Sequence, residues 1–315
     1  MTSSLRSAIA SSKPSGISAS APRRRYPAAA AGRDSVHIVN EQNSPEDSMV
    51  LIDQPRPGVA LVTLNRPERM NSMAFDVMVP LKGVLDGLTH DNDIRVVVLT
   101  GAGRGFSSGA DHKSAGSVPH VAGLTRPTFA LRSMEVLDDV ILAIRKMHQP
   151  VIAAVNGAAI GGGLCLALAC DIRLAAAGAY FRAAGINNGL TASELGLSYL
   201  LPKAIGTSRA FEAMLTGRDI DAEEAERIGL VSRTVPDDDL LDTCYEMAER
   251  IASFSRPGTE LTKRTLWSGL EAGSLEGHMQ AEGLGQLYVR LLTANFEEAV
   301  AARADKRAPT FTDDK

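Results

Sequence analysis

The sequence predicts an α/β protein in which short buried strands alternate with amphipathic helices. Three short runs rich in valine, isoleucine and leucine, each followed by Asn or Gly, are typical of buried strands: residues 59–64, 96–100 and 151–155. Apolar residues recur at helical spacing in two stretches between these runs. Because strands and helices alternate along the chain, we expect them to pack as α/β layers.

Two amphipathic helices are predicted between the strands. The apolar face of the first helix comprises Phe75, Met78, Leu81, Leu85 and Leu88. Pro80 lies inside this stretch and has no backbone N–H to donate, which leaves the start of the helix open by one turn. The apolar face of the second helix, which ends before Pro150, comprises Met134, Leu137, Val140, Ile141, Ile144 and Met147.

From about Lys203 onward the sequence is predicted to be almost entirely helical. Asp221 and Glu224 have the spacing of a capping box, and Gly229 ends the short helix that they begin. Three aspartates at 237–239 precede a further helix, whose apolar face comprises Leu240, Leu241, Cys244, Met247, Ala248 and Ile251. We therefore expect an α/β core over residues 49–202 and a helical region over 203–315. Residues 113–128, rich in Gly, Ser and Pro, are predicted to form a mobile loop beside the bound ligand.

Residues 1–48 differ in composition from the rest of the chain. Ser, Ala, Gly and Pro dominate them, and no acidic residue precedes Asp34, so we expect a disordered extension. Two hypotheses remain for this segment: an organellar transit peptide, or sequence upstream of a true start at Met49, which we favour. The three cysteines, Cys165, Cys170 and Cys244, form no C-x-x-C pair. We therefore expect a reducing compartment, the cytoplasm, with an organellar matrix as the alternative.

Composition and charge exclude several classes of partner. With 315 residues and 44% apolar content, the chain can fill a sizeable core. No apolar run is long enough to span a bilayer, so no membrane span is expected. A net charge of -4 and a pI near 5.9 give no broad electrostatic footprint for nucleic acid or anionic lipid. A small-molecule partner is therefore expected, and no metal.

Two glycine-rich segments, residues 100–111 and 156–164, follow strands directly. A dinucleotide fingerprint would require a third glycine where Phe106 stands, and neither segment ends in the Gly-Lys-Ser/Thr of a phosphate-binding loop. What remains is a pair of sharp turns that lead into helices, where free backbone N–H groups favour a developing negative charge. The alternative for either segment alone is that its glycines serve only tight turns and close packing.

Several segments in order resemble the crotonase superfamily, the enoyl-CoA hydratase/isomerase family. The resemblance covers about residues 50–311 and rests on residues 65–71, 99–111, 150–157, 170–172, 215–218, 222–231 and 306–309. It implies a crotonase-like spiral of ββα units, followed by a C-terminal helical region through which the chain forms trimers or hexamers. It also implies an acyl-CoA substrate and no separate cofactor, because coenzyme A is part of the substrate.

The resemblance assigns roles to individual residues. The backbone amides of Ala110 and Gly162 would form an oxyanion hole for the thioester oxygen, and each such donor is worth about 2.7 to 4 kcal/mol at the transition state. Lys113 and Lys306 stand at positions that contact the nucleotide part of coenzyme A in relatives, and Arg69 lies in the segment that flanks its adenine. Without the resemblance, the two lysines would be interpreted as solvated surface residues. The remaining candidate substrate contacts are Met70, Ser108, Asp111, His112, Gly161, Cys165 and Gly185.

The sequence departs from the family at the two glutamates that hydratases use. Cys165 and Gly185 occupy those positions, so the usual groups that activate water and protonate the α-carbon are missing. Glu194 falls where isomerases of the superfamily have an acidic base, if one inserted residue is allowed. A single partly desolvated carboxylate with a raised pKa can move a proton between two carbons, which is isomerisation. The alternative is that Glu194 only caps or solvates its loop.

Other ionisable side chains are weaker candidates for contact with the substrate. His112 stands where relatives have an aliphatic residue and could touch the substrate, whereas Cys165 is better explained as a buried inert thiol than as a nucleophile. Asp171 is predicted to be structural, and charged surface explains Asp111, Glu135, Asp138 and Asp139. We therefore predict a coenzyme A thioester isomerase or related lyase that acts on an unsaturated acyl chain. The alternative hypothesis is a catalytically silent acyl-CoA-binding oligomer.

Overall fold

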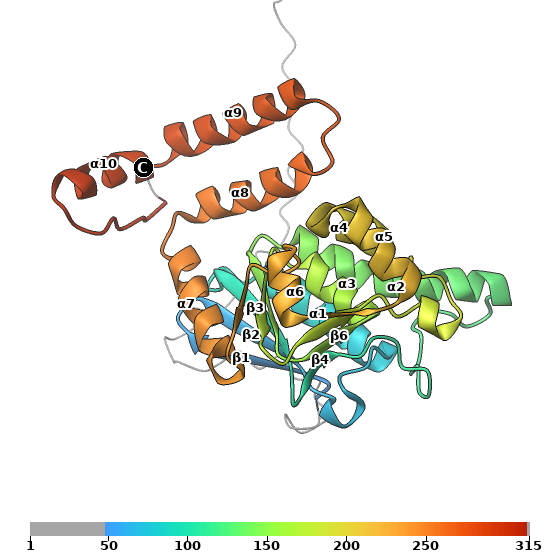
Figure 1. Ribbon diagram of the computed structural model, residues 1–315. Coiled ribbons are helices and arrows are strands. Elements are labelled where there is room, and N and C mark those ends of the chain that lie inside the picture. The colour runs from blue at the N-terminus through green and yellow to red at the C-terminus, as the bar shows by residue number, and fades with distance from the viewer. Residues whose placement is uncertain (1–47, 314–315) are drawn as a thin grey trace, which may run out of the picture. The chain divides into compact units, whose positions relative to one another are not determined.

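The computed structural model describes residues 48–313, and the described strands form two sheets (Figure 1). The first sheet has six strands in the order β1-β2-β3-β5-β7-β10. All of its neighbouring pairs are parallel except the antiparallel pair β1 and β2. The bounds are β1 Val50–Arg56, β2 Val59–Leu64, β3 Val96–Gly101, β5 Val151–Val155, β7 Ile172–Ala176 and β10 Arg233–Val235.

The three strands predicted from the sequence are confirmed as β2, β3 and β5. Every residue of β3 and β5 is buried, as expected for parallel strands that are covered on both faces. The structure extends β3 by one residue, to Gly101. These strands therefore form the centre of the core.

A second sheet of four short strands runs in the order β4-β6-β8-β9. Its strands are β4 Gly105–Ser107, β6 Ala158–Ile160, β8 Tyr180–Arg182 and β9 Asp219–Asp221. The strands β4, β6 and β8 each follow closely on a strand of the first sheet, namely β3, β5 and β7, and each precedes a helix. This repetition is the spiral of ββα units that the resemblance implies, and it brings the ends of β4 and β6 side by side.

The helices of the core largely match their predicted faces. Helix α1, Phe75–Thr89, contains Pro80 without interruption, and α2 spans Arg126–Lys146. Phe75 is half-buried and Met134 is exposed, whereas most of the other predicted face residues are buried. Helix α2 begins inside the segment predicted to be a loop, because Thr125 and Pro127 supply an extended N-cap and a proline in the first turn. Helix α3, Gly162–Ala169, is buried throughout.

The C-terminal half contains two strands that the sequence analysis did not foresee. β9 and β10 have three residues each, which is too short for a hydrophobic period to distinguish strand from turn. The N-cap half of the predicted capping box is confirmed, since the Asp221 carboxylate accepts a hydrogen bond from the Glu224 amide at 2.8 Å. The Glu224 carboxylate accepts hydrogen bonds from Arg218 at 2.7 and 2.9 Å. The helices are α4 Leu197–Ile205, α5 Thr207–Thr216, α6 Ala222–Arg227 and α7 Leu240–Ala252. The 3₁₀ helices of the described residues are η2 Pro67–Arg69, η3 Ile186–Asn188 and η4 Asp237–Asp239.

Three further helices end the described chain: α8 Arg256–Gly269, α9 Leu275–Leu292 and α10 Asn295–Ala304 (Figure 1). Lys263 and Trp267 attach α8 to the core, since they contact the two carboxylate oxygens of Asp171 at 2.9 and 2.6 Å. Asp171 is therefore structural, as predicted. Helix α9 has no buried residue.

Among the described helices, none is long and apolar enough to cross a membrane. The prediction of disorder for residues 1–48 falls, except for Ser48, outside the described residues.

Candidate functional site

The two glycine-rich segments form adjacent bends. The first follows β4, and the second joins β6 to the N-terminus of α3 at Gly161, whose φ is +52°. A Cβ atom on Gly109 would lie 2.5 Å from the carbonyl oxygen of Ile160 and 3.2 Å from the amide nitrogen of Gly162. Standard bond lengths then place the amide nitrogens of Ala110 and Gly162 within about 7 Å of each other. Only glycine fits at 109, and it permits the bends to approach.

The amides of Ala110 and Gly162 have no recorded hydrogen-bond acceptor within residues 48–313. On the first bend, Met73 donates to the carbonyl of Gly109 at 2.7 Å and accepts from the amide of Asp111 at 3.2 Å. Met73 thus binds the Gly109 carbonyl before Ala110 and the Asp111 amide after it, and the Ala110 amide between them stays free. Gly162 is the first residue of α3, where backbone N–H groups have no partner within the helix. Two free donors on adjacent bends can together bind an oxygen that gains negative charge.

Glu194 lies against the second bend. Its Oε1 atom is 3.2 Å from the position that a Cβ atom would occupy on Gly161. A sharp turn holds it there, because Leu195 and Gly196 both have positive φ angles and the amide of Leu197 donates to the Glu194 carbonyl at 2.7 Å. Burial raises the pKa of Glu194, and the charge of His112 lowers it by a smaller amount. The structure therefore brings Glu194 and Gly161 together.

Cys165 lies on α3, behind Glu194. Its Sγ donates to the carbonyl oxygen of Glu194 at 3.5 Å, and the residue is fully buried. Burial raises the pKa of the thiol well above its ordinary value, and the charge of Glu194 adds to the effect. Cys165 therefore stays protonated at neutral pH, as the interpretation of a buried inert thiol requires.

Gly185 is enclosed by its own loop. A Cβ atom there would overlap the carbonyl oxygen of Thr191. The amides of Asn188 and Leu190 both donate to the Gly185 carbonyl, at 3.1 and 3.0 Å, so the backbone closes tightly around this position. The loop has no room for a larger residue at 185 without moving its backbone.

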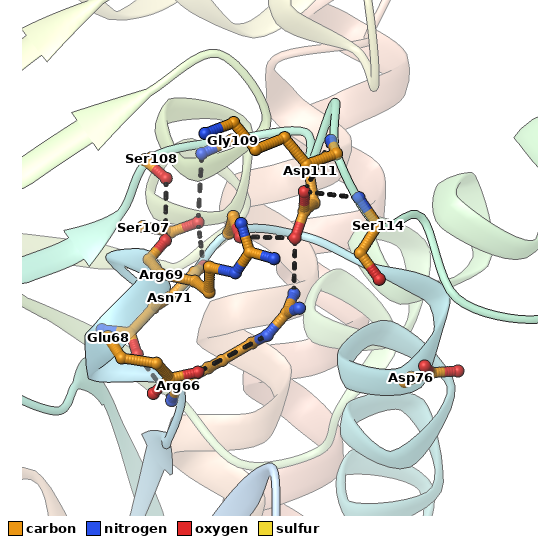
Figure 2. Close-up of polar contacts among 12 residues, drawn as sticks. Arg66, Glu68, Arg69, Asn71, Asp76, Ser107, Ser108, Gly109, Asp111 and Ser114 are labelled. Carbon is orange, nitrogen blue, oxygen red and sulfur yellow. Dashed lines mark hydrogen bonds and ion pairs between the residues drawn. The ribbon is translucent and has the colours of Figure 1, made fainter.

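Asp111 forms the centre of a network that anchors the first bend, and Figure 2 shows it between Arg66 and Ser114. Its carboxylate lies 2.8 Å from Arg66 Nη1 and 3.2 Å from the Ser72 hydroxyl, and it accepts from the amides of Lys113 and Ser114 at 2.9 Å each. The two backbone hydrogen bonds contribute most to lowering the pKa of Asp111 to about 2. The side chain is only 4% exposed. Asp111 thus stabilises the loop and is more than the charged surface that the sequence suggested.

The candidate contacts to coenzyme A divide into two groups. Arg69 lies beside Ser108, whose hydroxyl donates to the Arg69 carbonyl at 3.4 Å (Figure 2). The amide of Ser108 donates to the Met70 carbonyl at 2.9 Å. Lys113 is exposed and follows Asp111 directly. Lys306 lies just after α10, and among the described residues no recorded contact joins it to the two bends. Among the described residues, Lys306 therefore shares no hydrogen bond or ion pair with the other candidates.

Four residues of the site escaped the sequence analysis. The glycine-rich first segment indicated a bend, and Gly109 is one of its glycines. The sequence does not indicate which of these glycines faces the other bend. Met73 packs its sulfur against Gly162, Arg66 pairs with Asp111, and Asn188 contacts His112. These three contacts join segments far apart in the sequence, so no local pattern could have predicted them. Within the described residues, no group of three or more His, Cys, Asp and Glu side chains could hold a metal ion.

A cavity of about 660 Å³ lies away from the bends, between α3, α4 and α8. Leu168, Leu200, Leu266 and Leu270 contribute to its largely apolar lining. It reaches neither the Ala110 bend nor the N-terminus of α3, so it is separate from the candidate site.

Comparison with known proteins decides the family. The family model for enoyl-CoA hydratase/isomerase matches residues 55–314. The chain belongs to the enoyl-CoA hydratase/isomerase family. Members of this family are enzymes of the crotonase superfamily, so the fold and the acyl-CoA chemistry expected from the sequence are confirmed at family level.

Relatives of this chain are described variously as a hydratase, a hydratase/isomerase and an isomerase. A probable enoyl-CoA hydratase of Mycobacterium bovis is 80% identical over 267 residues, which cover 85% of this chain and 94% of the relative. The crystal structure of a probable enoyl-CoA hydratase/isomerase from Mycobacterium abscessus has a TM-score of 0.82 and 71% identity over 85% of this chain and 100% of that one. The structure of a monofunctional enoyl-CoA isomerase from M. smegmatis has a TM-score of 0.64 and 73% identity, over 74% of this chain and 99% of that one.

Proposed function

We propose that this enzyme isomerises an unsaturated fatty acyl-CoA by moving its double bond, with a related lyase reaction as the nearest variant. The amides of Ala110 and Gly162 would bind the thioester oxygen, while Glu194 takes a proton from the α-carbon. The electron pair left on that carbon moves into the thioester carbonyl and forms an enolate. As the enolate collapses, a new double bond forms between the α- and β-carbons, and Glu194 returns the proton to the γ-carbon, the far carbon of the original double bond. No water enters the product.

One spatial relationship supports this proposal above the others. A carboxylate oxygen of Glu194 lies beside the same glycine bend that presents the free amide of Gly162. A base and an oxyanion donor at one bend can act on adjacent atoms of a thioester, the α-carbon and the carbonyl oxygen. The raised pKa of Glu194 suits a group that must both take and return a proton.

Isomerisation is favoured over hydration by the groups at the two positions of the hydratase glutamates. Cys165 is a buried thiol, and Gly185 has no side chain and no room for one. Neither position supplies a carboxylate to activate water. The M. smegmatis relative, described as a monofunctional enoyl-CoA isomerase, supports the same choice.

We further propose that the enzyme assembles as a homotrimer or a hexamer. Apolar side chains on α9 are exposed, a pattern typical of a surface that another copy covers: Leu275, Met279, Leu284, Leu287, Tyr288, Leu291 and Leu292. Within residues 48–313, no hydrogen bond or ion pair joins Lys306 to the two bends, and we propose that it contacts coenzyme A bound to a neighbouring copy. The three cysteines are free and buried, which suits the reducing cytoplasm that we propose as its compartment.

The test is product analysis in heavy water. Purified enzyme is incubated with 2-enoyl-, 3-enoyl- and dienoyl-CoA in ordinary and in heavy water, and the products are followed by mass spectrometry. Isomerisation predicts a shifted double bond with no added water, and deuterium uptake wherever Glu194 exchanges its proton with solvent. Addition of water to 2-enoyl-CoA as the main reaction would overturn the proposal. Tight binding in calorimetry with no reaction on any substrate would favour the silent binder.

A further inference from the structure

Met73 contacts both of the bends that form the candidate site. Its backbone makes a parallel β-bridge with Ala110 on the first bend. In this bridge the Met73 amide donates to the Gly109 carbonyl at 2.7 Å, and the Met73 carbonyl accepts from the Asp111 amide at 3.2 Å. The peptide groups on either side of Ala110 are thereby held, which fixes the direction of its own amide. The side chain of Met73 is only 7% exposed.

The same side chain packs against Gly162 on the second bend. A Cβ atom on Gly162 would lie 2.3 Å from the Met73 sulfur and 3.0 Å from its terminal methyl carbon. One bond length then puts the sulfur within about 4 Å of the Gly162 Cα, which is van der Waals contact. Leu195 Cδ1 lies 3.4 Å from the same Cβ position, so Met73 and the residue after Glu194 both cover Gly162.

The segment before Met73 is anchored in the core. Asn71 is fully buried, and its side-chain amide donates to the carbonyls of Ala102 and Gly105 at 2.9 and 2.7 Å. The Ser107 hydroxyl donates to the Asn71 carbonyl at 2.8 Å. The backbone two residues before Met73 therefore cannot shift without breaking buried hydrogen bonds, which is costly.

Met73 holds the two amides by different parts of the residue. The Ala110 amide is oriented by backbone hydrogen bonds, which remain when the side chain is changed. The contact with Gly162 is made by the side chain alone. Substitutions at position 73 should therefore loosen the Gly162 amide and leave the Ala110 amide in place.

We propose that Met73 is a positioning residue that sets the separation of the Ala110 and Gly162 amides, through its backbone on one bend and its thioether on the other. The inference rests on the function proposed above, because it explains how the oxyanion hole of that reaction keeps its geometry. Such donors act at about 2.7 to 3.1 Å from the oxyanion. A misplacement of about 1 Å can lower the rate about 100-fold.

The experiment measures the polarisation of a bound thioester carbonyl, without turnover. Hexanoyl-CoA, which has no double bond to move, is labelled with ¹³C at its carbonyl carbon. Isotope-edited infrared difference spectra then isolate the stretching band of that carbonyl in the complex. Two donors weaken the C=O bond, so the wild type should shift the band to lower frequency than in free hexanoyl-CoA. Met73→Ala should lose roughly half of this shift, because the Ala110 donor remains.

Two milder variants differ in whether they reach Gly162. Met73→Leu keeps a carbon at the position of the sulfur and should retain most of the shift. Met73→Val keeps a buried apolar side chain but ends one atom short of that position, so it should lose the shift as Met73→Ala does. This pair tests the contact even if Met73→Ala does not fold.

A substitution at Gly162 tests the contact from the other side. Gly162→Ala should lose the shift, since its methyl group would overlap the Met73 sulfur. In the double variant with Met73→Ala, the methyl group enters the space that the thioether has left. The double variant should therefore regain part of the shift that Met73→Ala loses, a non-additive result expected of residues in contact.

Met78→Ala is the matched control. It removes another buried methionine, from α1, and should keep the full shift although it also lowers thermal stability. Circular dichroism establishes that each variant is folded at the temperature of the spectra. A full shift in Met73→Ala or Met73→Val, an equal loss in Met78→Ala, or no shift in the wild type would overturn the proposal.

Activity on 3-enoyl-CoA separates this proposal from the proposed function. If the wild type isomerises, kcat in Met73→Ala should fall about 10- to 100-fold with little change in KM, because the donors act most strongly on the enolate. A wild type that isomerises while Met73→Ala keeps the full shift would refute only the role of Met73. A shift that depends on Met73 in a protein without isomerase activity would refute the proposed function and leave the positioning role standing.

Discussion

A carboxylate oxygen of Glu194 lies 3.2 Å from the position that a Cβ atom would occupy on Gly161, at the bend that leads into α3. This proximity depends on glycine, because a side chain at 161 would push against the carboxylate. It also places an acid next to a helix N-terminus, where unpaired amides stabilise negative charge. A base and an anion-binding group thus share one bend, and the predictions below depend on that arrangement.

Replacing Glu194 with Gln should lower turnover of 3-enoyl-CoA by about 100- to 10,000-fold, the usual contribution of a general base. The amide keeps the size of the side chain but cannot accept the proton. Acyl-CoA affinity, measured by calorimetry, should stay close to that of the wild type. Glu246→Gln, at an exposed position on α7, serves as the matched control and should retain full activity. Unchanged turnover in Glu194→Gln would remove this residue from the mechanism.

Gly185→Ala should destabilise the protein by about 1 to 3 kcal/mol, since the added methyl group would overlap the carbonyl oxygen of Thr191. The loop that contains Glu194 must then move, so turnover should fall as well. Gly83→Ala is the control, because a Cβ there meets nothing within 4 Å inside α1. It should stabilise the helix by about 0.5 to 1 kcal/mol. Urea denaturation of both variants measures the difference, and equal stabilities would contradict the described packing.

Arg66 and Asp111 should be energetically coupled, since their side chains lie 2.8 Å apart and are 13% and 4% exposed. A double-mutant cycle with Arg66→Met and Asp111→Asn should give a coupling free energy of about 1 to 3 kcal/mol. Coupling near zero would show that the two residues act separately.

The network around Asp111, in which the hydrogen bonds from the amides of Ser114 and Lys113 lower its pKa most, predicts a dependence of stability on pH. Because folding lowers the pKa of Asp111 to about 2, its contribution to stability is present above the ordinary Asp pKa of about 3.9 and is lost as the pH falls towards 2. Asp111→Asn should therefore lose less stability than the wild type over this acidic range. Thermal melting at a series of pH values measures the difference, and parallel losses in both proteins would contradict the network.

Leu287→Asp should dissociate the proposed trimer or hexamer, because it introduces a charge into the exposed apolar face of α9. Gln286→Glu changes the charge of the neighbouring exposed position and should leave the assembly intact. Sedimentation velocity measures the mass of each variant. A monomeric wild type, or an unchanged assembly in Leu287→Asp, would contradict this assignment of the surface.

The sequence predicted those features of the fold that local patterns encode. Continuous apolar runs identified β2, β3 and β5, and the spacing of Asp221 and Glu224 identified the N-terminus of α6. The three-residue strands β9 and β10 were missed, because they are defined by pairing with β8 and β7. Helix α2 begins earlier than predicted, since residues 126–133 are mostly exposed and lack an apolar period.

The candidate site was predictable only in part. The glycines and Glu194 could be identified from the resemblance, but their contacts depend on distant segments. The approach of Gly109 to Gly162 follows from the parallel pairing of β4 with β6, and the contact between Asn188 and His112 joins residues 76 positions apart. The role of Asp111 as an anchor depends on Arg66, 45 residues earlier. No local spacing encodes such contacts.

The most direct test is a crystal structure with an unreactive acyl-CoA thioether or thioester analogue that retains the carbonyl oxygen. The account predicts that this oxygen lies about 2.7 to 3.1 Å from the amide nitrogens of both Ala110 and Gly162, with the α-carbon facing Glu194. A carbonyl oxygen beyond hydrogen-bond distance from either amide would contradict it.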